Sequence, residues 1–87
     1  MYKYTDHARK RMVSRGIGDA EIKAAVEKGD LEFTRIDEKG RGTEYTHSIE
    51  LKDPFPRKIM VGWTYDGDDV LILSIYEVKR KWRQERP

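Results

Sequence analysis

The spacing of apolar residues changes once along the chain, near Leu31, and this change limits the fold more than any other feature. Before it, apolar side chains recur every three or four residues, as on one face of an amphipathic helix. After it, apolar and polar residues alternate, as in a strand with one buried face. Helices that all precede the strands predict an α+β domain, because a parallel α/β sheet needs the two kinds of element to alternate.

The first predicted helix spans about residues 7–15. Thr5 or Asp6 supplies a side-chain oxygen for its N-terminal cap. Gly16 suits the left-handed position that ends a helix, and Ile17 can close over that end as the apolar partner.

A second helix is predicted to begin after Gly18, with Glu21 three residues further on, and to end at Gly29. Glycine is a tolerable cap residue although it has no side-chain acceptor. The helix carries a single apolar stripe, formed by Ile22, Ala25 and Val26.

Four strands are predicted to follow. The first begins at Leu31, and residues 37–42 read as a loop. Residues 43–51 alternate strictly, with the apolar side chains and His47 on one face. A third strand places Ile59, Val61, Trp63 and Tyr65 on one face, and residues 66–69 form a hairpin turn. Residues 70–76 are the most apolar run, which predicts a central strand covered on both faces.

The expected architecture is therefore two N-terminal helices packed on one face of a four-stranded antiparallel sheet, in the order α-α-β-β-β-β. Residues 1–78 are predicted to form a single domain. Residues 79–87 are predicted to form a basic tail or a short C-terminal helix with Trp82 docked.

The composition narrows the setting of the protein. The chain contains no cysteine, which excludes disulfides and cysteine-ligated zinc and favours a reducing compartment. No apolar run approaches the roughly 20 residues of a membrane helix, and no signal-peptide pattern opens the sequence. We therefore expect a cytoplasmic protein that does not bind membranes. No spacing of histidines or carboxylates indicates a metal site, and no motif indicates a cofactor.

Positive charge is concentrated at the two ends of the chain, although the net charge is only +2. Residues 1–16 carry five basic residues and one acidic residue, and so do residues 79–87. If the fold brings the two ends together, a basic face results that suits phosphate or an acidic partner. Solvated ends that keep the protein soluble are the alternative.

The first helix contains the most distinctive chemical pattern. At about 100° per residue, its polar side chains form a stripe directly beside the apolar pair Ala8 and Met12. This border position predicts either a cleft, where arginines hold an anion and a histidine moves a proton, or a structural hydrogen-bond network with the sheet. The stripe consists of His7, Arg11, Ser14 and Arg15.

The same segment, H-A-x-x-R-M-x-x-R-G-I over residues 7–17, carries a resemblance to a known family. Together with the short acidic helix, the strands after it and the pair Ser74 and Tyr76, it resembles the bacterial family called domain of unknown function 4258, over about residues 4–77. Gly18 departs from the family, which commonly has a capping Ser or Thr there. The element order is more distantly similar to RelE-type toxin ribonucleases of toxin–antitoxin pairs, which implies RNA as a substrate or ligand.

On that analogy, a metal-independent ribonuclease needs a base, a cation and an acid around one phosphate. The predicted catalytic residues are His7, Arg11, Arg15 and Tyr76, and the predicted substrate-binding residues are Ser74 and Arg57. Ser74 and Tyr76 share one face of the last strand, where an ordinary structural pair is the alternative. His47 lies on an apolar face, which favours a satisfied core histidine.

A second class of function is a non-catalytic module that pairs with itself or with a cognate protein partner. Hydrophobic residues make up only 37% of the chain, so a homodimer interface would add burial that the monomer lacks. In that case the His/Arg stripe is structural.

Overall fold

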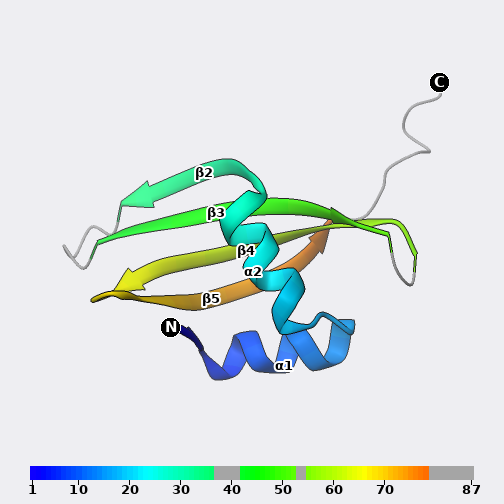
Figure 1. Ribbon diagram of the computed structural model, residues 1–87, viewed down its shortest axis with the longest axis horizontal. Coiled ribbons are helices and arrows are strands. Elements are labelled where there is room, and N and C mark those ends of the chain that lie inside the picture. Colours follow the sequence, from blue (N-terminus) through cyan, green and yellow to red (C-terminus); the bar gives the residue numbers. More distant parts are fainter. Residues whose placement is uncertain (37–41, 53–54, 79–87) are drawn as a thin grey trace.

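A computed structural model of the protein describes residues 1–36, 42–52 and 55–78 (Figure 1). Its elements follow in the order β1 (Tyr2–Tyr4), α1 (Asp6–Arg15), α2 (Asp19–Lys28), β2 (Asp30–Ile36), β3 (Thr43–Leu51), β4 (Arg57–Asp66) and β5 (Asp69–Val78). The α+β class and the two predicted helices are confirmed. The predicted tail or helix over residues 79–87 lies outside the described residues.

The sheet has five strands in the order β1-β5-β4-β3-β2, so the prediction of four antiparallel strands is wrong. The additional strand, β1, pairs in parallel with β5, with Tyr2 opposite Val70 and Tyr4 opposite Ile72. The other pairs are antiparallel. Three residues are too few to show the alternation of apolar and polar side chains that predicts a strand. This strand forms because the N-terminal segment lies along β5.

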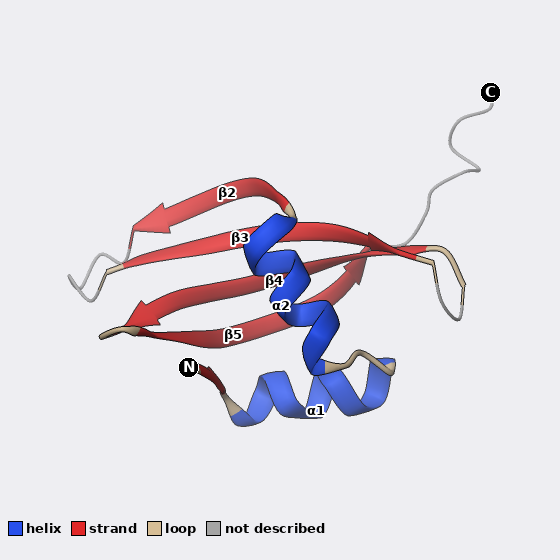
Figure 2. Cartoon of the chain, viewed as in Figure 1, coloured by secondary structure: helices blue, strands red, loops and turns tan. Residues whose placement is uncertain are grey.

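Both helices pack on one face of the sheet, which we call the helix face. Helix α1 contacts β5 and β1, whereas α2 crosses β3 and β4 (Figure 2). The core lies between these layers and consists of Ala8, Ile17, Ile22, Ala25, Ile59, Val61, Trp63, Ile72 and Ile75. No helix among the described residues covers the opposite face, which we call the open face.

Within residues 1–36, 42–52 and 55–78, helices therefore cover β5 on one face only, in contrast to the prediction of cover on both. A bulge explains its continuous apolar run, because Trp63 pairs with Ile72 and Gly62 with Ser74, which leaves Leu73 without a partner in the register. The extra residue brings Ile72 and Ile75 to the core at a spacing of three. Leu73 is only half-buried.

A second bulge lies in β2. Leu31 pairs with His47, but Phe33 pairs with Thr46, so Glu32 is the inserted residue. Because His47 and Thr46 point to opposite faces of β3, Leu31 lies on the helix face and Phe33 on the open face. The alternation of Leu31 and Phe33 in the sequence thus does not place them together.

The residues that cap the two helices are those that the sequence predicts. The Ala8 backbone N–H donates to Thr5 Oγ1 at 3.1 Å. Gly16 has φ 64°, and the Ile17 N–H bonds the Met12 carbonyl at 2.9 Å. The Gly18 N–H donates to Glu21 Oε1 at 2.5 Å, which compensates for the missing side chain at this cap.

Arg57 connects the sheet to the end of α1. Its side chain lies on the helix face, is 5% exposed, and donates from Nη1 to the Arg15 carbonyl at 2.7 Å. A longer bond of 3.3 Å joins Nη2 to the Gly16 carbonyl. The last carbonyls of a helix lack intrahelical hydrogen-bond partners and carry partial negative charge. The buried guanidinium of Arg57 supplies hydrogen bonds to these carbonyls and offsets their charge.

None of the helices in the described residues is long and apolar enough to cross a membrane.

We predict that Arg57→Met lowers the free energy of unfolding by about 2 kcal/mol, because buried carbonyls are deprived of a charged donor. Lys58→Met is the matched control. Lys58 is partly exposed and, among the residues that the structure describes, pairs with Glu32 alone at 3.4 Å, so the decrease there is below about 1 kcal/mol. Urea unfolding followed by circular dichroism measures both. Equal decreases in the two variants would contradict the capping role.

Candidate functional site

The polar stripe predicted on α1 divides into outward and inward residues. His7 and Ser14 are exposed, whereas Arg11 and Arg15 are half-buried. Ala8 is fully buried and Met12 packs against the core, as the border position of the stripe predicts. His7 and Ser14 therefore face solvent, Arg15 faces the sheet, and Arg11 lies at the border between the two sides.

Arg15 is bound to the sheet. Its Nη1 lies 3.8 Å from Glu77 Oε1 on β5, and its Nε is buried without a hydrogen-bond partner in the described part of the chain. Arg57 is likewise occupied with the end of α1. Two of the three predicted arginines therefore already make contacts within the protein.

Ser74 and Tyr76 lie on the open face, away from α1. Ser74 pairs with Gly62 and Tyr76 with Met60, whereas the intervening Ile75 points into the core. Tyr76 is 41% exposed, which leaves its hydroxyl accessible. The structure thus brings Ser74 and Tyr76 to one face, but places His7 on the other side of β5.

Ser74 has a close neighbour on that face. A Cβ added at Gly62 would lie 2.6 Å from Ser74 Oγ, while its other nearest atoms would be 3.8 Å away or more. The hydroxyl therefore fills the space above the glycine. This arrangement gives Ser74 a packing role in the sheet.

The outward side of α1 is basic. His7, Lys10, Arg11 and Ser14 share it by helical spacing, and we call these four residues the α1 basic surface. Within the part of the chain that the structure describes, neither Lys10 nor Arg11 makes an ion pair. By contrast, Lys3, Lys23 and Lys58 each contact a carboxylate.

The carboxyl end of β5 lies beside the end of α1. The Arg15–Glu77 contact joins them, one residue before the end of the strand at Val78. The basic segment 79–87 continues from this point, although its own structure lies outside the described residues. The fold thus brings the start of one basic end of the sequence to the other.

A groove on the helix face is lined by aromatic rings. Tyr45 stacks on Trp63 with ring centroids 4.8 Å apart, and Tyr65 meets Trp63 edge-on at 5.1 Å. The groove has a volume of about 460 Å³, and Glu27 and Leu31 close its rim beside α2. None of the predicted site residues lines it.

His47 lies within this groove as a satisfied histidine, as its place on an apolar face predicts. The Trp63 Nε1–H donates to His47 Nδ1 at 3.0 Å. Because an indole nitrogen only donates, His47 must present a lone pair at Nδ1, and a neutral ring then carries its proton on Nε2.

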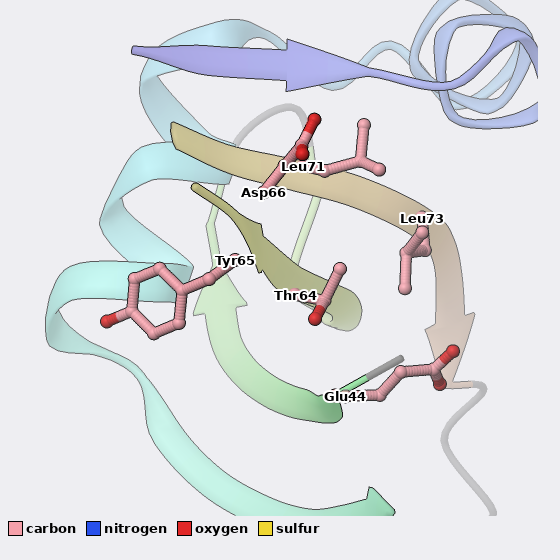
Figure 3. Close-up of a pocket in the computed structure, with 7 residues that line it drawn as sticks. Glu44, Thr64, Tyr65, Asp66, Leu71 and Leu73 are labelled. Atoms are coloured by element: carbon pink, nitrogen blue, oxygen red, sulfur yellow. The ribbon is translucent and has the colours of Figure 1, made fainter. Parts of the chain in front are cut away.

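A second cavity, of about 390 Å³, lies at the turn between β4 and β5 (Figure 3). Glu44, Thr64 and Leu73 line it from the open face, and Figure 3 shows Tyr65 pointing away from them. Glu44 and Asp66 make this end of the sheet acidic, which disfavours an anionic ligand. Lys3 Nζ lies 2.7 Å from Asp66 Oδ2. The amino terminus bonds Asp69 and lowers the pKa of the Asp69 carboxyl.

Sequence reasoning missed the link between β1 and α2. The Tyr2 hydroxyl donates to Glu27 Oε2 at 2.9 Å. Desolvation, followed by this bond to Glu27, raises the pKa of Tyr2 to about 12. The two residues are far apart in the chain, and no local pattern in the sequence connects them.

The described residues contain no group of three or more histidine, aspartate or glutamate side chains placed to hold a metal ion.

Comparison with known protein families shows which family the chain belongs to. Residues 4–77 match the family described as Domain of unknown function (DUF4258). The chain belongs to this family. No curated protein and no solved structure matches it significantly. The family assignment confirms the resemblance carried by His7, Arg11 and Arg15, and it assigns no activity to them.

Two substitutions test the packing of Ser74 on Gly62. We predict that Gly62→Ala destabilises the wild-type protein, because the new Cβ meets Ser74 Oγ. In a Ser74→Ala background, the same change leaves only ordinary contacts and is neutral or stabilising by up to about 1 kcal/mol. Urea unfolding of the four variants gives the coupling. Additive effects would show that Ser74 does not fill this space.

We predict that Tyr2 ionises only near pH 12. Because its folded pKa is raised, its contribution to stability is complete below pH 10 and disappears as the pH rises through about 12. The difference between the tyrosinate absorbance titrations of wild type and Tyr2→Phe isolates this group. Glu27→Gln should bring the midpoint partway towards 10, and an unchanged midpoint would exclude the role of Glu27.

Proposed function

We propose that this domain binds single-stranded RNA through the α1 basic surface, with the basic segment 79–87 adding charge beside it. The observation that carries the proposal is that two cations without an ion pair in the described part of the chain lie next to each other on α1, whereas Lys28 and Arg35, which also lack one there, lie apart on α2 and β2. Lys3, Lys23 and Lys58 are paired within the fold, whereas Lys10 and Arg11 make no ion pair in the described part of the chain. Cations without partners on one surface are the electrostatic footprint of a polyanion site.

The side chains on this surface suit phosphate. Arg11 supplies a planar set of donors that matches a phosphate group, and Lys10 supplies a compact positive charge. His7 adds a ring N–H donor on the same side of the helix, whereas the Ser14 hydroxyl donates to the Arg11 carbonyl at 3.3 Å. Such groups bind the backbone without reading its sequence, so the affinity should depend strongly on salt.

The shape of the site favours a single strand. Helix α1 spans ten residues, or about 15 Å, and one of its sides is packed on β5. A flexible single strand can adjust the positions of its phosphates to so short a surface. The acidic turn between β4 and β5 lies away from α1's carboxyl end, which the Arg15–Glu77 contact joins to the end of β5.

The proposal is limited to binding. His7 and Tyr76 lie on different sides of β5, so the predicted catalytic residues do not surround one phosphate in this fold. A cleavage assay with intact cellular RNA accompanies the binding measurements, with His7→Ala and Arg11→Ala beside the wild type.

We predict that Lys10→Glu/Arg11→Glu weakens the binding of a fluorescent oligouridine at least tenfold, because two attractive charges become repulsive. The slope of log affinity against log salt should fall by about 0.7 for each phosphate that is no longer neutralised. Fluorescence anisotropy at several salt concentrations measures both. A chain ending at Val78 should also bind more weakly.

Two control variants keep the test specific. Lys28→Glu changes an exposed charge on α2, and Tyr76→Phe removes a hydroxyl from the open face, so both should bind like the wild type. Absence of binding at low salt, or equal weakening by Lys28→Glu, would refute the α1 site. Tighter binding of duplex DNA than of the single strand would refute RNA as the ligand. Circular dichroism confirms that each variant is folded.

A further inference from the structure

The two edges of the sheet are protected very differently. At one edge, β1 and α1 lie against β5. At the other edge, the described part of the chain places no strand but β3 beside β2, and all seven residues of β2 are exposed. The outer N–H and C=O groups of such a strand are a template for another strand.

The exposed side chains of β2 are unusually apolar for an edge. Leu31 is 56% exposed, Phe33 is 44% exposed and Ile36 is 75% exposed. They are three of the eight large hydrophobic side chains that the described residues expose. An edge that a protein keeps away from other chains more often carries charge or proline at such positions.

The charges of β2 identify the strand that fits it. Asp30 stands at the beginning of the strand and Arg35 near its end, and neither makes an ion pair within the described residues. Glu32 is already held on the open face by the Ser48 hydroxyl and by Lys58. An antiparallel copy of β2 sets Asp30 against Arg35 twice, whereas a parallel copy sets like charges side by side.

We infer that β2 is the interface of a homodimer, in which it pairs antiparallel with β2 of a second copy. The register sets Asp30 of each copy opposite Arg35 of the other, and Leu31 opposite Thr34. The pairing to β3 places both Asp30 and Arg35 on the open face, because they face Ser48 and Glu44 there. Leu31 and Thr34 face His47 and Tyr45, on the helix face.

The bulge at Glu32 is what makes this register consistent. Residues 30 and 35, or 31 and 34, are separated by an odd number of positions and would lie on opposite faces of a regular strand. The inserted residue shifts the second half of β2 by one position and restores a common face. The dimer is then one continuous sheet, with the helices of both copies on the same side.

This interface is independent of the α1 basic surface. The strand order places β2 and α1 at opposite edges of the sheet, so pairing through β2 leaves both α1 helices free. The inference therefore stands or falls separately from RNA binding, and it is tested without RNA.

The test is a charge exchange followed by light scattering during size-exclusion chromatography, from low micromolar to near-millimolar protein. The wild type should be a dimer. Asp30→Arg and Arg35→Asp each place like charges opposite one another twice and should weaken the dimer about tenfold or more. The double variant Asp30→Arg/Arg35→Asp restores opposite charges and should recover the dimer. Arg9→Glu is the control, because it changes an exposed charge on α1, at the opposite edge of the sheet from β2.

A wild type that stays monomeric throughout this range would overturn the inference. A dimer that both single variants leave unchanged would also overturn it, because the interface would then lie elsewhere. Failure of the double variant to recover the dimer, with its fold intact by circular dichroism, would refute the antiparallel register. Amide hydrogen exchange adds a separate readout, since β2 should be more protected in the dimer than at the lowest concentration.

Discussion

The attachment of α1 to the sheet depends on one buried cation. Arg57 leaves the first position of β4 and donates to the carbonyls of Arg15 and Gly16, which no helical bond satisfies. Its neighbour Arg15 reaches Glu77 on β5, so two strands hold the same end of the helix. The sheet thus holds both the end and the inward face of α1. Because of this, Ala8 lies in the core and the basic side chains on the outward side lie in solvent.

That attachment also explains why the family motif contains both structural and accessible residues. Arg15 faces the sheet, whereas His7 faces solvent from the same helix. Only the outward residues remain free to meet a ligand, and there the described chain leaves positive charge without an ion pair. The aromatic groove and the acidic turn are chemically different surfaces, and neither suits a polyanion.

The described residues cover one face and one edge of the sheet. On the open face, Thr46 and Ser48 are nevertheless buried, and Ser74 fills the space above Gly62. On the open edge, nothing in the described ranges covers β2. A domain with a small core thus retains surface that a second chain can bury, and strand pairing supplies directional hydrogen bonds as well as apolar packing.

The sequence alone determined the local elements and much of the layering. Apolar period, Thr5, Gly16 and the Gly18–Glu21 pair define both helices, and strict alternation defines β3 and β4, because these signals act between residues close in the chain. Tertiary structure alone decided the rest. The pairing of β1 with β5, the bulges at Glu32 and Leu73, and the partners of Arg57 all join residues far apart in the chain. His7 and Tyr76 are also far apart in the chain, so only the tertiary structure shows that they lie on different sides of β5.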